Sequence, residues 1–210
     1  MDVALGFKAR TGRAVVVAIG GTVREPLFVE RTELRLLPQG AFAPYHAAER
    51  LEPSAARDSV KRSIEAANYL ATNGIDAAVA RLAAAGHTVC GCGVLVGTGM
   101  PNWTTDDILA VHVRMHKAEG ELFRDVLVAG TRACGLSLMT LPDKSAMDEA
   151  AKLLRIAPAV LAARLVTLGK SAGAPWGKDQ KEAATAAIVA LGAVAGPRQS
   201  DALYLPSDRL

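Results

Sequence analysis

The sequence is poor in aromatic residues, cysteines and long apolar runs, and each shortage argues against a class of protein. Only 4% of the 210 residues are aromatic, which argues against a surface on which nucleic-acid bases stack. Three cysteines, an odd number, give no disulfide framework. We recognise no signal peptide and no run long enough to span a membrane, so we expect a cytoplasmic protein of bacterial type.

Strong charge of either sign is also missing. The formal net charge is +3 and the pI is near 8.9, which permits a DNA or RNA partner without requiring one. Half of the residues are apolar, as in a globular chain that buries a core. The length fits one domain. We expect a domain over residues 1–192 and a C-terminal tail over residues 193–210.

The clearest structural pattern lies between His87 and Gly135. Residues 89–96 form an uncharged apolar run, typical of a strand that is covered on both faces. Thr104 then precedes Asp107 by three residues, a capping-box spacing that predicts a helix from Thr104 to about residue 133. A short apolar strand follows over residues 136–141. The apolar stripe of the helix is expected at Val111, Met115, Ala118, Leu122, Val126 and Ala129.

The remaining elements complete an α/β pattern. Three strands joined by short turns predict an antiparallel meander, with the third strand at the edge because its apolar residues alternate with charged ones. Two crossover units and a last alanine-rich helix follow. We expect strands over residues 3–8, 14–19 and 26–37, and helices over 54–72, 75–85 (after a break at Asn73-Gly74), 145–169 (broken at Pro158) and 179–191.

This element order is that of the ribonuclease H-like fold, and within that group the chain resembles the Holliday-junction resolvases. The resemblance implies a mixed five-stranded sheet, with three antiparallel strands, two parallel crossovers and helices on both faces. It covers about residues 3–191. It rests on three stretches: GFKARTG at residues 6–12, which stands in place of a Gly-Ile-Asp-Pro-Gly strand and Thr-Gly; RMHKAEGELFRDVLVAGTRACGL in the central helix; and DQKEAA at residues 179–184, which matches an Asp-x-x-Asp spacing.

The departures from the resolvase pattern concern the catalytic acids. The family holds two metal ions, Mg²⁺ or Mn²⁺, with carboxylates of the first strand, the fourth strand and the last helix. Lys8 falls on the first-strand position, residues 89–96 contain no acid, and only Asp179 and Glu182 remain. We therefore predict a catalytically degenerate relative that has a structural or nucleic-acid-associated binding role. Lys8 is either a structural lysine at the strand end, with its stem on apolar surface, or a partner of Asp179 in an ion pair that replaces a metal ion.

A second group of candidate residues lies on the central helix. His112, His116 and Glu119 are spaced i, i+4, i+7 and share one helix face, and two histidines one turn apart are a recurrent pair of metal ligands. The alternative is a polar helix edge beside the core. If this group lay within metal-ligand reach of Asp179 and Glu182, the protein would be a metal-dependent hydrolase or nuclease with a rearranged site.

Two further expectations concern the alanine-rich helices and the cysteines. We expect a homodimer joined through the alanine-rich helices. Cys90 and Cys92 are two residues apart on a predicted strand and so should lie on the same face of the sheet. We interpret both as small buried packing residues rather than metal ligands, because no further ligand stands at a zinc-like spacing.

Overall fold

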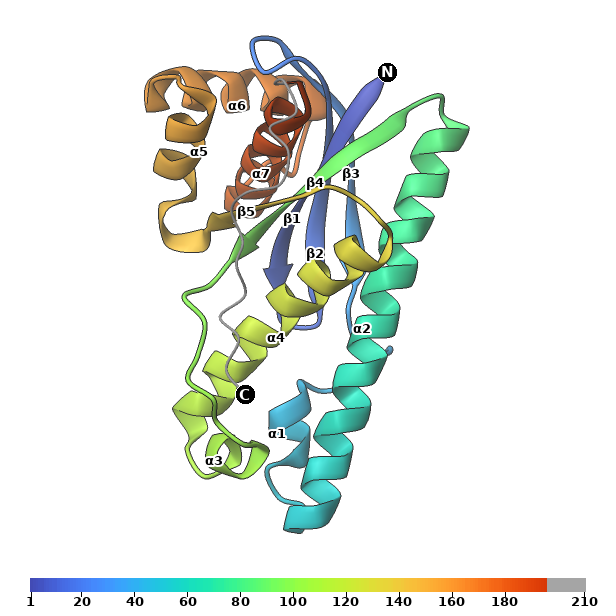
Figure 1. Cartoon of the computed structure of the whole chain (residues 1–210), viewed down its shortest axis with the longest axis vertical. Helices are drawn as coiled ribbons and strands as arrows, with labels where there is room; N and C mark the ends of the chain where they lie inside the picture. Colours follow the sequence, from blue (N-terminus) through green and yellow to red (C-terminus); the bar gives the residue numbers. More distant parts are fainter. Residues whose placement is uncertain (196–210) are drawn as a thin grey trace.

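The structure is a computed structural model and describes residues 1–195. One five-stranded sheet is covered by helices on both faces (Figure 1). The strands are β1 (Asp2–Arg10), β2 (Arg13–Gly21), β3 (Pro26–Arg35), β4 (Thr88–Val96) and β5 (Leu138–Pro142). The helices are α1 (Pro44–Ala48), α2 (Pro53–Ala84), α3 (Thr105–Leu109), α4 (His112–Ala133), the 3₁₀ turn η1 (Asp143–Ser145), α5 (Ala146–Leu154), α6 (Pro158–Ala172) and α7 (Lys178–Ala195).

The sheet has the topology that the sequence predicts. Its strand order is β3-β2-β1-β4-β5, with antiparallel pairing from β3 to β1 and parallel pairing of β1 with β4 and of β4 with β5. The prediction of β3 as an edge strand is confirmed. Because β1 lies at the centre, the residues at its carboxyl end reach the middle of the sheet edge.

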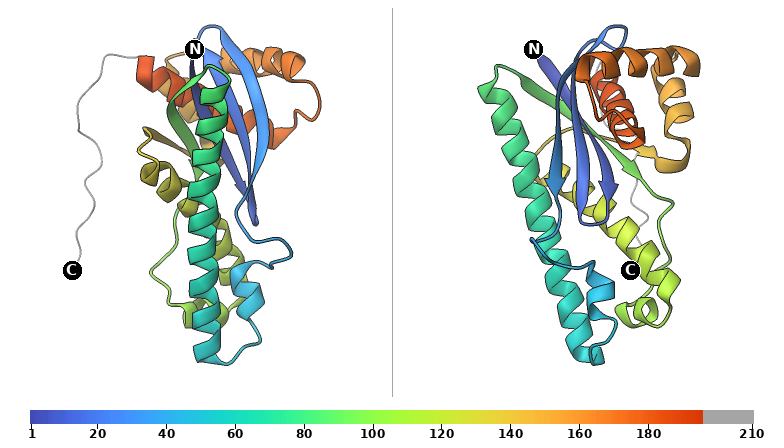
Figure 2. Two further views of the ribbon diagram at one scale, coloured as in Figure 1. Left: turned by 90° about the vertical axis from the view of Figure 1, so that its right-hand side faces the viewer. Right: turned by 180° about the vertical axis from the view of Figure 1, so that it is seen from behind.

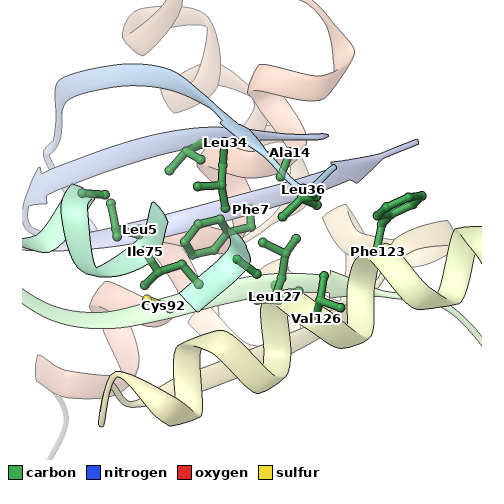
Figure 3. Packing of buried hydrophobic residues seen from close by; sticks show 14 of the residues in the cluster. Leu5, Phe7, Ala14, Leu34, Leu36, Ile75, Cys92, Phe123, Val126 and Leu127 are labelled. Atoms are coloured by element: carbon green, nitrogen blue, oxygen red, sulfur yellow. The ribbon is translucent and has the colours of Figure 1, made fainter. Parts of the chain in front are cut away.

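Successive residues of the central strands pack in two separate hydrophobic cores, one on each face of the sheet. On one face, Leu5, Phe7 and Cys92 pack against α2 and α4 (Figure 3). On the other face, Val17 and Leu95 belong to a core formed with α5, α6 and α7, the three helices drawn in orange and red on that side of the sheet (Figure 2). Each central strand is therefore apolar on both sides, which explains its uninterrupted apolar sequence.

Helix α7 lies closest to the sheet. Its residues 183–191 are almost entirely buried, and glycines of β1 and β4 leave room for its backbone. A Cβ atom at Gly6 would overlap the carbonyl oxygen of Ala183, and one at Gly93 would overlap that of Ala186. The alanine face of α7 thus packs against the sheet of its own chain.

Two helix predictions were wrong in detail. The break predicted at Asn73-Gly74 does not occur, since α2 runs through it. A Cβ at Gly74 would overlap the Leu34 side chain, so this glycine permits close packing of the helix on β3 instead of ending the helix. The predicted helix from Thr104 to residue 133 is divided into α3 and α4 at residues 110–111, although the capping box of Thr104 and Asp107 is present.

The division of this helix also changes the predicted apolar stripe. Val111 precedes α4 and is exposed, and Ala129 is exposed as well. The other four members of the stripe are buried.

The predicted break at Pro158 is confirmed, because α6 begins there. Helix α6 continues to Ala172, so the loop before α7 is shorter than the predicted helix bounds imply.

The two neighbouring cysteines of β4 lie on opposite faces, contrary to the prediction. A register shift in the pairing of β1 with β4 skips Cys90, and this bulge reverses the alternation of side chains. Cys92 therefore packs in the core beneath α2 and α4, and Cys90 in the core beneath α7. Burial raises the pKa of Cys92 to about 12, so its thiol stays protonated.

The predicted tail over residues 193–210 falls mostly outside the described residues. Helix α7 extends to Ala195, three residues beyond the predicted end of the domain. None of the helices in the described part of the chain is both long and apolar enough to cross a membrane.

Candidate functional site

An ion-pair network occupies the carboxyl end of the central strands. Lys8 ends the buried part of β1, Asp143 follows β5, and Glu182 lies near the start of α7. The Lys8 ammonium contacts Asp143 Oδ1 and lies 2.9 Å from Glu182 Oε2. The Lys8 side chain is only 6% exposed. Three elements that are distant in sequence therefore converge on one buried cation.

Two arginines neutralise the remaining charge of this network. Arg10 Nε donates to Asp179 Oδ2 at 2.8 Å, and Arg124 Nη2 donates to Asp143 Oδ2 at 2.8 Å. Asp179 is thus bonded to Arg10, and not to Lys8 as the sequence suggested. The direct partners of Lys8 are Glu182, which was a predicted site residue, and Asp143, which was not.

The ion pairs lower the pKa values of Asp143 and Asp179. Partial burial acts to raise the pKa of Asp143, but hydrogen bonds from Lys8 and Arg124 outweigh it and lower that pKa below the usual range. The hydrogen bond from Arg10 lowers the pKa of Asp179. Both carboxylates are therefore charged at neutral pH and remain bonded to their cations.

This arrangement does not fit the two metal ions of the resolvase pattern. Each of the three carboxylates that meet here already has a cationic partner among Lys8, Arg10 and Arg124. A divalent ion needs free, anionic oxygen ligands, and here a divalent ion would have to displace a lysine or an arginine from each of them.

A cleft of about 790 Å³ opens beside the network. Lys8 and Glu182 lie at its base, while the side chains of Lys144, Lys178 and Lys181 are exposed along its walls. Lys178 lies 3.7 Å from Glu182. Within residues 1–195, Lys144 and Lys181 form no ion pair. The base of the cleft is therefore neutral, and on its walls the three lysines outnumber the exposed Asp148.

The start of α7 is held in place by the loop before it. The Arg31 guanidinium of β3 donates to the carbonyl oxygens of residues 173, 174 and 175. Trp176 Nε1 donates to Leu165 O at 2.9 Å, and the indole packs edge-on against Phe28. Trp176 therefore packs against β3 and α6, and these contacts hold the loop directly before Asp179.

A second group of polar residues lies at the start of α4. His112 and His116 are exposed on the first turns of α4, and their Nε2 atoms are 3.1 Å apart. His46 of α1 joins them, with its ring centroid 5.2 Å from that of His112 and 4.6 Å from that of His116. One ring nitrogen from each of the three lies within 4.8 Å of the others.

Glu119 does not stand beside His112 and His116 as a ligand of the same kind. It is 4% exposed, and its Oε1 accepts hydrogen bonds from the backbone N–H groups of Tyr45 and His46. Both of its oxygens also lie 2.8–2.9 Å from His46 Nδ1. Glu119 thus fixes the orientation of His46, which lies beside His112 and His116.

His46 and Asp143 are not among the predicted site residues, for different reasons. His46 lies in a proline-bounded segment without periodicity, and only the tertiary packing of α1 on α4 brings it to the other histidines. Asp143 could have been found, because it directly follows a predicted strand that is parallel to β4. The carboxyl ends of parallel strands meet at one sheet edge, where polar residues form sites.

The two polar groups remain separate. Arg124, which bonds Asp143, follows His116 by eight residues on α4, or about 12 Å at the helical rise of 1.5 Å per residue. Figure 1 likewise shows α1, α3 and the start of α4 at one end of the molecule and α5 to α7 at the other. The structure does not bring the histidines within metal-ligand reach of Asp179 and Glu182.

Comparison with known proteins shows similarity at the level of structure. A scan against protein-family models finds no match, and a search of curated proteins finds none. Among solved structures, the chain is similar to T. thermophilus RuvC in complex with a Holliday junction substrate, with 10% identity, 90% of this chain and 92% of that chain covered, and a TM-score of 0.46.

It is also similar to a second Thermus thermophilus RuvC structure, with 11% identity, coverage of 89% of this chain and 92% of that chain, and a TM-score of 0.44. At such identities the likeness concerns the fold alone. The strand order β3-β2-β1-β4-β5, with three antiparallel strands followed by two parallel crossovers, makes this an α/β protein of the ribonuclease H-like fold.

Proposed function

We propose that this protein is a catalytically degenerate, resolvase-like protein that binds nucleic acid in the cleft beside Lys8 and does not cut it. The observation that carries the proposal is the buried Lys8 ammonium, paired with Asp143 and Glu182. A two-metal nuclease holds both ions with free carboxylates, whereas these carboxylates are bonded to side chains of the chain itself.

The walls of the cleft support binding of the nucleic-acid backbone. Lys144 and Lys181 are exposed and have no carboxylate partner in the described residues, and unpaired lysines attract phosphates with a strong dependence on salt. The chain has few aromatic residues for stacking on bases. We therefore expect phosphate contacts that carry little sequence specificity.

The first experiment uses labelled branched DNA, single-stranded DNA and single-stranded RNA with Mg²⁺ or Mn²⁺, analysed on native and denaturing gels. We expect a retarded complex and no cleavage. Cleavage that disappears in Asp179→Ala would contradict the proposal, because it would show that a working metal site is assembled from other ligands. Sedimentation of the same samples tests the expected homodimer.

A pair of double variants locates the binding surface. Lys144→Gln/Lys181→Gln removes two charges from the cleft, while Lys61→Gln/Lys170→Gln removes two exposed charges elsewhere. If each cleft lysine contacts one phosphate, the first variant lowers the magnitude of the slope of log K against log salt by about 2. The control should keep the wild-type slope. Equal slopes in the two variants would place binding outside the cleft.

A further inference from the structure

We infer that His46, His112 and His116 form a binding site for a divalent transition-metal ion of the zinc class, with Glu119 as the residue that orients His46. This inference concerns the end of the molecule formed by α1, α3 and the start of α4 (Figure 1). It is independent of nucleic-acid binding, because the cleft beside Lys8 contributes no residue to it.

The spacing of the nitrogens supports a shared ion. Two imidazole nitrogens bound to one tetrahedral zinc at 2.0–2.1 Å lie about 3.3 Å from each other. The Nε2 atoms of His112 and His116 are 3.1 Å apart, close to that value. A nitrogen of His46 lies within 4.8 Å of both, so small rotations of the imidazole rings would complete a three-histidine set.

The surroundings of His46 match those of a metal-bound histidine. Such a histidine commonly donates its other ring N–H to a carboxylate, which fixes the ring and makes it a better ligand. Glu119 accepts from His46 Nδ1 at 2.8 Å, which leaves Nε2 for the ion. Glu49 Oε1 lies 3.9 Å from Nδ1 of His112, the ring nitrogen that does not face His116.

The site is held on a small apolar core of its own. Tyr45, Ala48, Ile108, Met115 and Ala118 pack together with the first turns of α2. This core joins α1 to α3 and α4, so the three histidines are positioned by packing and not by a mobile loop. A site whose ligands are already in place binds its ion with less cost in conformational entropy.

The type and number of ligands select the class of ion. Imidazole suits zinc, nickel, copper and iron, whereas magnesium and calcium prefer carboxylate and carbonyl oxygens. Three protein ligands leave a fourth position open, as in zinc sites that bind a water or a substrate there. The His112 side chain is 63% exposed, so the open position faces solvent.

Cobalt and zinc titrations of protein without a polyhistidine tag test the inference. We expect one Co²⁺ per chain, with a visible spectrum of nitrogen and oxygen ligation, and displacement by Zn²⁺. His46→Ala and His112→Ala should weaken Zn²⁺ binding roughly 100-fold or more, and Glu119→Gln about 10–100-fold. His87→Gln is the matched control, because His87 is the remaining histidine of the chain and lies outside the cluster.

Thermal unfolding provides a second measurement. Zn²⁺ should raise the midpoint of the wild type and of His87→Gln but leave that of His116→Ala unchanged, because an ion stabilises only a folded state that binds it. Unchanged affinity in His46→Ala would overturn the inference by showing that the pair on α4 binds alone. Thiolate charge-transfer absorption would place the ion at a cysteine and would equally overturn it.

Discussion

Lys8 does at the end of β1 what a divalent ion does in a two-metal nuclease: it neutralises carboxylates that arrive from separate elements. Its ammonium is bonded to Asp143 and lies 2.9 Å from Glu182, and Arg124 completes the coordination of Asp143. A buried cation with two anionic partners is sensitive to the loss of either side, because each unpaired charge would be left in a poorly solvated place.

We predict that Lys8→Met lowers the free energy of unfolding by about 3–5 kcal/mol, the usual cost of breaking a buried ion pair. Arg13→Met is the control on the neighbouring strand, since Arg13 and Glu33 form a pair whose side chains are 52% and 54% exposed. Its loss should cost less than about 1 kcal/mol. Urea unfolding at pH 7 measures both. Equal costs would refute a special role for the Lys8 charge.

Single residues of both polar groups are predictable from the sequence, but the contacts between them are not. Lys8 and Glu182 were selected from the resolvase pattern, and the structure brings them into contact. His112 and His116 were selected from their helical spacing, and they are adjacent. Asp143 and His46 were missed, because their partners come from other elements and local spacing carries no information about such contacts.

Helix α7 packs directly on the face of the sheet that lies opposite α2 and α4. Gly6 and Gly93 allow its backbone to lie directly on β1 and β4, and its alanines fill the remaining space without longer side chains. Small residues on both sides of an interface bring the two backbones close. A single added methyl group would then overlap backbone atoms of the neighbouring element.

Glycine substitutions in different elements should therefore have opposite effects. Gly6→Ala places a methyl group against the backbone of α7 and should destabilise the fold by about 1–3 kcal/mol. Gly120→Ala lies within α4, where the nearest neighbour of the new Cβ is the end of the Arg124 side chain at 3.5 Å. It should stabilise the protein by about 0.5–1 kcal/mol through helix propensity. Thermal unfolding of both variants checks the difference in sign.

Among the elements, the succession of strands and helices along the chain and the antiparallel and parallel connections agree with the prediction, whereas several helix boundaries do not. The apolar run of β4 follows directly from burial on two faces, whereas in the edge strand β3 only Leu34 is buried. Gly74 was misread because a glycine that permits close packing looks the same in sequence as one that ends a helix. The bulge at Cys90 is set by pairing with β1, and the sequence of β4 alone does not reveal it.

For the molecule as a whole, the ion pairs at the end of the sheet predict a loss of stability in acid. The pKa values of Asp143 and Asp179 are lowered in the folded state. Their contribution to stability is therefore fully present above the unfolded value of about 3.9 and is lost as the pH falls through the lowered values.

We expect the free energy of unfolding to fall as the pH drops below about 4 and through the lowered pKa values of Asp143 and Asp179, and to fall less in Asp143→Asn. Asp58→Asn, an exposed carboxylate of α2, serves as control and should keep the wild-type pH dependence. Urea unfolding at several pH values measures this. The readout is the change with pH and not the stability at one pH, so a general destabilisation by Asp143→Asn does not obscure it. An unchanged pH dependence would show that Asp143 is not held as the structure indicates.

The neutral centre around Lys8 also affects how the chain first folds. In a centre built for metal ions, the carboxylates repel one another until ions arrive, so closing that end of the sheet depends on the composition of the surrounding medium. Here the cations that neutralise the carboxylates are side chains of the same chain, namely Lys8, Arg10 and Arg124. We therefore expect that folding of this part of the sheet does not depend on the supply of magnesium or manganese.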